Sequence, residues 1–132
     1  MAKPKVFVSF DYDDRSVKEG LVAQERDPAC PFDFADNSIT VVLSDGWVAE
    51  ARRLIAAADY VVVLCGTQSH QSKRQLTELQ IAKELGKRHF LLRATREHTP
   101  TRPRSARPDE PLYPASWPTV AALLRGEHPP TR

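Results

Sequence analysis

Small hydroxyls, a glycine and carboxylates follow several apolar runs of this sequence. Ser9 and Asp11 stand at the end of the first run, and Gly66 follows another. Glu78 lies further along the chain, with Arg74 one helical turn before it. Exposed backbone N–H groups and small hydroxyls at such positions suit phosphate groups and ribose hydroxyls. These segments are therefore candidates for a site that binds a phosphate and a ribose.

The spacing of the apolar residues predicts strands that alternate with helices. Near-continuous apolar runs are typical of strands buried on both faces, and apolar residues at helical spacing fill the segments between them. Residues 39–43 fit either a strand or a packed loop. The alternation predicts a parallel sheet with helices on both faces. The expected strands are residues 5–10, 32–35, 60–65 and 89–93, and the expected helices run from residue 13 or 14 to 26, from 47 to 58 and from 72 or 73 to 85.

Such a sheet gathers the chemistry at one edge. Ligands of open parallel sheets bind at the carboxyl ends of the strands, near the point where the strand order reverses. Glu78 and Arg74 lie in the first turns of the third expected helix, which places them at the same edge. The rule also selects Ser9, Phe10 and Asp11, then Asp36 and Ser38, then Gly66, and finally the segment after Arg93.

Each candidate also has a purely structural interpretation. Glu78 can pair with Arg74 across a solvated helix face, a contact worth roughly 0.2–0.5 kcal/mol. The pattern alone favours this pairing over catalysis. The other structural interpretations are helix caps for Asp11, Asp13 and Asp14, a small buried strand residue for Ser9, and a core anchor for Trp47.

Composition limits the classes of protein that fit. The chain has 132 residues, 41% of them hydrophobic and 27% charged, which suits one domain with one core. A net charge of +2 does not favour nucleic-acid binding. Two cysteines are too few for a disulfide framework, and no run resembles a signal peptide or a membrane span. We therefore expect a cytoplasmic protein without membrane or metal partners.

The last part of the chain differs in composition. Residues 100–118 are rich in proline and arginine, which predicts an extended, surface-wrapped or partly disordered segment. Residues 117–125 fit a short closing helix, with Trp117 among its anchors. The expected organisation is an α/β domain at residues 1–99 and a Pro/Arg-rich C-terminal extension at residues 100–132.

Several segments resemble TIR domains, and in particular the TIR proteins of bacterial Thoeris antiphage defence. Residues 6–10 with the acidic residues after them are similar to the opening strand and loop of the family, and residues 47–66 are similar to its middle. The most specific likeness is at residues 66–78, where a glycine ends a strand and a helix carries a glutamate. Many relatives have a tryptophan shortly before that glutamate, whereas this chain has Arg74 or Gln75.

The resemblance implies a flavodoxin-like fold and an enzyme that cleaves NAD+. Glu78 would be the catalytic glutamate. Ser9 and Phe10 would line the NAD+ pocket, with Asp45 or Trp47 near it. NAD+ would be the substrate, and no separate cofactor is expected. The other substrate-binding candidates are Asp11, Asp36, Ser38, Gly66 and Arg74.

The family's chemistry needs only one carboxylate. The bond between nicotinamide and ribose breaks with a neutral leaving group, and the ribose develops oxocarbenium character that a carboxylate stabilises. Thoeris members resemble makers of cyclic or conjugated ADP-ribose signals that diffuse to an effector. The resemblance also implies self-association and a phage-derived activator.

Two other functions use the same kind of fold. A non-catalytic TIR module would act through its surfaces in protein–protein contacts. A phosphotransfer domain needs an acceptor aspartate at the end of the third strand, where this chain has Cys65 and Gly66. Residues 11–13 suggest the start of a phosphatase of the haloacid-dehalogenase type. However, no later strand of this sequence ends in the acidic pair that such an enzyme needs. Both phosphoryl-transfer interpretations are therefore disfavoured.

Overall fold

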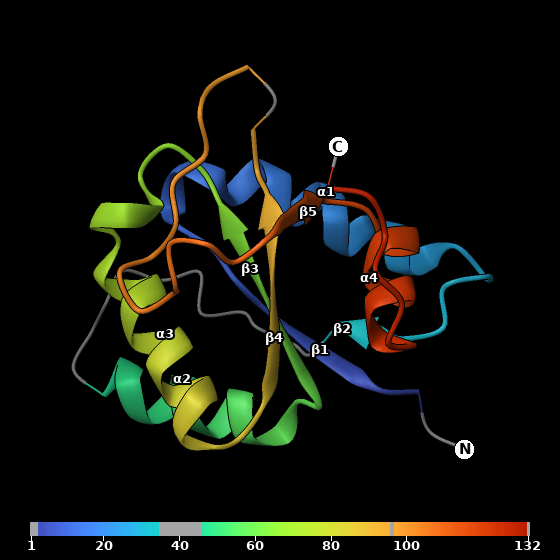
Figure 1. Cartoon of the computed structure of the whole chain (residues 1–132). Helices are drawn as coiled ribbons and strands as arrows, with labels where there is room; N and C mark the ends of the chain where they lie inside the picture. Colours follow the sequence, from blue (N-terminus) through green and yellow to red (C-terminus); the bar gives the residue numbers. More distant parts are fainter. Residues whose placement is uncertain (1–2, 35–45, 96, 132) are drawn as a thin grey trace.

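Five parallel strands form one sheet in the computed structural model, which describes residues 3–34, 46–95 and 97–131 (Figure 1). The strand order is β2-β1-β3-β4-β5, so β1 lies between β2 and β3 and the order reverses at β1. This is the flavodoxin-like order, and its binding crevice lies between β1 and β3. The strands are β1 (Lys5–Ser9), β2 (Asp33–Phe34), β3 (Tyr60–Cys65), β4 (Arg88–Arg93) and β5 (Leu112–Pro114).

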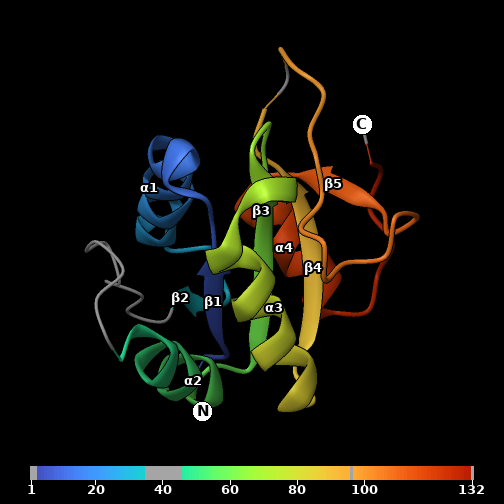
Figure 2. The same cartoon turned by 90° about the vertical axis from the view of Figure 1, so that its left-hand side faces the viewer.

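Helices cover both faces of the sheet, as the alternation predicts. Alternate residues of β3 divide between two cores: Val62 and Leu64 pack on one face, and Val61 and Val63 on the other. Figure 2 shows α3 in front of the sheet and α4 behind it. The first face carries α1 (Arg15–Ala23) and α4 (Trp117–Leu124), and the second carries α2 (Trp47–Ala57) and α3 (Lys73–Glu84).

Short 3₁₀ turns extend the expected helices. The first helical segment consists of η1 (Tyr12–Asp14), α1 and η2 (Gln24–Arg26). A further turn, η3 (Ser69–Gln71), precedes α3, whose N-cap Ser72 accepts a hydrogen bond from the Gln75 backbone N–H. The cap fixes where α3 begins and therefore how far Glu78 lies from the sheet edge.

The C-terminal segment joins the sheet, which the sequence pattern did not predict. β5 pairs in parallel with β4 and is a fifth strand beyond the four that the apolar spacing predicts. The closing helix is confirmed as α4, and Val120 and Leu123 are buried in the same core as β1 and β3. The core therefore extends across the expected boundary between residues 99 and 100. β5 has only three residues and ends in a proline, so it carries little strand signal.

The connection from β4 to β5 contains no helix in its described residues. Figure 1 shows it rising above the sheet, passing beside α3 and returning to β5. Thr101 donates to the Gly66 carbonyl at 2.7 Å, and Ser105 donates to the Leu76 carbonyl at 3.0 Å. Glu110 accepts hydrogen bonds from His89 Nε2 at 2.5 Å and from the Arg107 backbone at 2.7 Å. Among the described residues, no helix combines the length and apolar character that crossing a bilayer requires.

Candidate active site

Glu78 lies buried at the carboxyl ends of β1 and β3, where the strand order reverses. The strand alternation that sends Val8 and Phe10 to one face sends Ser9 to the other, where α3 packs. The Ser9 hydroxyl donates a hydrogen bond of 2.8 Å to Glu78 Oε1. Both residues have 0% exposure, so the solvated-face interpretation of Glu78 was wrong. The pair joins the end of β1 to the first turns of α3.

Arg74 pairs with Glu78 from one turn nearer the sheet edge. Its Nε lies 3.4 Å from Glu78 Oε2, and its guanidinium carbon lies 4.4 Å from the centre of the Phe10 ring. Arg74 is 8% exposed, so this cation is itself buried. Lys18 Nζ, which comes from α1, lies 5.4 Å from the centre of the same Phe10 ring. The arginine thus spans the end of β1, with a carboxylate on one side and an aromatic ring on the other.

Gln75 supplies donors to strand carbonyls at the same edge. Its Nε2 lies 2.6 Å from the Leu64 carbonyl oxygen and 3.4 Å from that of Ser9. Two acceptors at one end of the amide identify that end as the NH₂ group. The amide oxygen is buried without a hydrogen-bond partner among the described residues. Gln75 therefore clamps β1 to β3 at the crevice.

The environment of Glu78 strongly affects its protonation. Burial raises the pKa of Glu78 from 4.5 to about 7, against the opposing effects of the Arg74 charge and the Ser9 hydrogen bond. A buried carboxyl that exchanges its proton near neutral pH is typical of functional sites, although structural ion pairs share this property. Near neutral pH both the acid and the carboxylate are populated.

A second carboxyl packs against the end of β3. A Cβ at Gly66 would come within 2.2 Å of Asp14 Oδ2, so the side chain lies directly over this glycine. Burial, followed by the charges of Asp11 and Asp13, raises the pKa of Asp14 to about 6. Asp14 is the N-cap residue of α1, yet its side chain makes no cap hydrogen bond. Its carboxyl therefore faces Gly66 and does not cap α1 as expected.

Two of the other predicted site residues, Asp11 and Trp47, have structural roles. Asp11 caps η1 by accepting from the Asp13 backbone N–H at 3.1 Å, which is the structural interpretation. Trp47 is half-buried at the start of α2 and packs against the core on that face, as a core anchor does. Three further candidates, Asp36, Ser38 and Asp45, lie outside the described residues.

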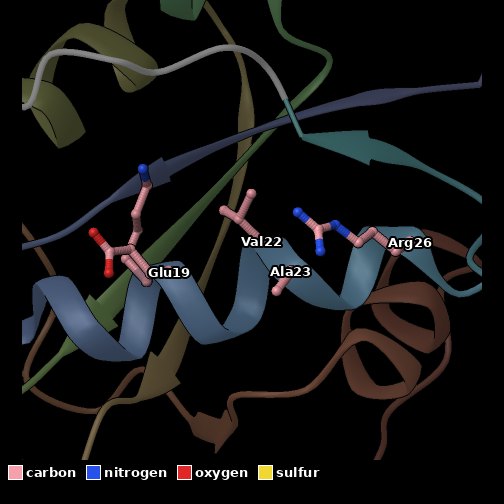
Figure 3. A pocket seen from close by; sticks show the side chains of 5 residues that line it. Glu19, Val22, Ala23 and Arg26 are labelled. Carbon is pink, nitrogen blue, oxygen red and sulfur yellow. The ribbon is translucent and has the colours of Figure 1, made fainter.

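Two surface recesses flank α1 and the start of α3, and neither is lined by Glu78. The larger has a volume of about 410 Å³ and runs along one side of α1 (Figure 3). The smaller has about 300 Å³ and lies between the start of α3 and the β4–β5 connection. The first is lined by Lys18, Glu19, Val22, Ala23 and Arg26, and the second by His70, Gln71, Ser72, Lys73, Leu76 and Arg104.

Sequence reasoning missed Gln75 because it assigned the buried stripe of α3 to apolar residues. Apolar residues at helical spacing predict a buried stripe of Leu76, Leu79, Ala82 and Leu85, but Leu76 and Leu85 are only partly buried. The stripe includes Gln75, Glu78, Leu79 and Ala82 instead, which share one face at helical spacing. Strand carbonyls and a serine hydroxyl require polar partners here, so polar side chains occupy core-facing positions.

The fold and these contacts define a flavodoxin-like α/β protein with a buried Ser–Glu–Arg cluster at the carboxyl ends of β1 and β3. Comparison with protein-family models and with curated protein sequences gave no match. The assignment of function therefore depends on the chemistry of this cluster and on the sequence resemblance described above.

Proposed function

We propose that this protein is a TIR-type enzyme that cleaves NAD+ between nicotinamide and ribose, with Glu78 as its catalytic carboxylate. The observation that carries the proposal is the Ser9–Glu78 hydrogen bond of 2.8 Å at the crevice between β1 and β3. In this fold class ligands bind at that crevice. A carboxylate there would lie beside the ribose of a bound dinucleotide.

The reaction needs charge stabilisation more than proton transfer. The bond between C1′ and the nicotinamide nitrogen breaks, and its electron pair leaves with nicotinamide, which becomes neutral. Positive charge then develops on the ribose, and the ionised Glu78 stabilises it. Water at C1′ gives ADP-ribose, whereas an adenine or ribose atom of the same molecule gives a cyclic product. Ser9 holds the carboxylate in position.

We expect Glu78→Gln to abolish nicotinamide release while the protein stays folded. The amide keeps the shape of the side chain and an oxygen for Ser9, but it carries no negative charge. The measurement is nicotinamide release by chromatography, with folding checked by circular dichroism. The wild-type rate should rise with pH through about 7, because only the deprotonated form of Glu78 stabilises the ribose cation.

Glu84→Gln is the matched control, since Glu84 lies on the same helix but is exposed and pairs with Arg52 on the surface. It should leave nicotinamide release unchanged. Nicotinamide release by Glu78→Gln at the wild-type rate would contradict the catalytic assignment. So would no release by wild-type protein with added lysate from phage-infected cells.

A non-catalytic interaction module is the second candidate function. The observation that favours it is the 0% exposure of Glu78, because a carboxylate that serves only the fold needs no access to a ligand. The discriminating measurement is calorimetric titration with NAD+. NAD+ binding that weakens in the Glu78→Gln variant supports the enzyme. Binding of a protein partner that is equally strong in wild type and in Glu78→Gln supports the interaction module.

The resemblance extends the proposal to antiphage defence. The product would be a cyclic or conjugated ADP-ribose signal that diffuses to an effector, with a phage-derived activator upstream. Self-association would complete the site in an assembly. Mass spectrometry of the small molecules formed from NAD+, with and without lysate from infected cells, tests these assignments together.

A further inference from the structure

We propose that Arg74 is a gate and specificity residue that covers Glu78 and admits ligands carrying an anionic group. The inference rests on the proposed function and adds to it a requirement for the phosphate portion of the substrate. It assigns Arg74 a role on the ligand as well as on the fold.

The first argument is position along α3. The helix begins at the carboxyl edge of the sheet, so Arg74 stands one turn nearer that edge than Glu78 on the same helix face. The guanidinium fills the space between the Glu78 carboxylate and the Phe10 ring. Glu78 has no exposed area, and Arg74 retains 8% exposure. Among the described residues, Arg74 therefore covers the side of Glu78 that faces this edge.

The second argument is the chemistry of displacement. A buried carboxylate that loses its cation is left with an unpaired charge, so Arg74 leaves only if the guanidinium gains another partner. A phosphate offers the paired oxygens that guanidinium binds in a bidentate manner. An uncharged sugar or nucleoside offers no such exchange. The contact therefore couples access to Glu78 to the charge of the ligand.

The Glu78–Arg74 contact of 3.4 Å is longer than an ordinary charge-assisted hydrogen bond. The Ser9–Glu78 bond at 2.8 Å is short by comparison. When Arg74 swings away, Ser9 still holds the carboxylate. The cluster thus has one fixed partner and one replaceable partner for the same side chain.

A titration that needs no enzyme activity tests the gate. We expect Arg74→Ala to lower the pKa of Glu78 towards its ordinary value, measured by carbon NMR of the side-chain carboxyl. Opening the site admits water and removes burial, which is the largest cause of the raised pKa. If Arg74 were only a structural partner, the site would stay closed and the lost positive charge would raise the pKa instead.

The matched control is Lys73→Ala, which removes the same charge from the exposed neighbouring position. It should leave the pKa of Glu78 unchanged. An unchanged or raised pKa in Arg74→Ala overturns the gate. If Arg74→Ala does not fold, Arg74→Gln gives the same comparison with a side chain that still reaches Phe10.

Substrate preference gives the second test. Wild-type protein should release nicotinamide from NAD+ and very little from nicotinamide riboside, which lacks phosphate. Arg74→Ala should reduce this preference about tenfold, the scale of one lost charge-assisted hydrogen bond. An unchanged preference overturns the specificity role. Absence of release from both compounds in every variant contradicts the proposed function, whereas the titration still decides whether Arg74 closes the site.

Discussion

Two carboxyl groups lie where β1 and β3 end, and each makes a different set of contacts. Glu78 is fully buried beside Ser9 and Arg74, and Asp14 is partly buried over Gly66. Burial raises the pKa of both groups. Groups of this kind cost stability when they ionise, which is typical of sites selected for chemistry.

Gly66→Ala tests the close approach of Asp14. The added Cβ would come within 2.2 Å of Asp14 Oδ2, so the carboxyl must move. We expect a loss of about 1–3 kcal/mol in the free energy of unfolding, measured by urea denaturation. Combining it with Asp14→Ala should recover most of that loss, because the clashing atoms are gone. If Gly66→Ala lowers the free energy of unfolding equally in wild type and in Asp14→Ala, the strain does not come from Asp14.

At the scale of elements, the short edge strands and the closing helix complete the molecule. β2 and β5 have two and three residues, so the paired edges of the sheet are short. α4 packs its buried residues against the core beneath β1 and β3. The β4–β5 connection binds α3 through Ser105 and the end of β3 through Thr101. The C-terminal segment therefore supports the elements that carry the site.

Leu123→Ala measures how much α4 contributes. Leu123 is 2% exposed in the core, whereas its neighbour Leu124 is only partly buried. We expect the Leu123 variant to lose about 2–5 kcal/mol in the free energy of unfolding, through lost burial and a cavity. Leu124→Ala is the matched control and should lose clearly less. Equal small losses in both variants would mean that α4 does not belong to the cooperative core.

For the molecule as a whole, the raised pKa of Glu78 predicts how stability depends on pH. The folded protein holds this proton up to pH about 7, whereas the unfolded chain releases it near 4.5. The folded state therefore carries more protons between these values, and the free energy of unfolding falls as pH rises through that window. The raised pKa of Asp14 acts in the same direction between its ordinary value and about 6.

Thermal unfolding of Glu78→Gln at several pH values tests this dependence. Above pH about 7 the variant should be more stable than wild type, by roughly 1–3 kcal/mol, because it avoids a buried charge. Below the ordinary pKa of a glutamate the advantage should vanish. A variant that is less stable than wild type at pH 8 would show that the ionised Glu78 stabilises the fold.

Local patterns were enough to predict most elements and the sheet edge where Ser9 and Glu78 meet. β3 matches its expected range, and the start of α3 was expected at residue 72 or 73, because buried strands and capped helices leave short-range signals. Parallel topology follows from their alternation, and it brings Ser9 and Glu78 to one edge. The candidate pair was therefore available from the sequence.

Tertiary structure decided which side of α3 faces the sheet and what closes the core. Gln75 is buried because it meets the carbonyls of Leu64 and Ser9, which are far from it in the chain. β5 forms because β4 offers an open edge, while its three residues carry almost no propensity of their own. Contacts between distant segments leave no periodic pattern, so sequence reading did not find them.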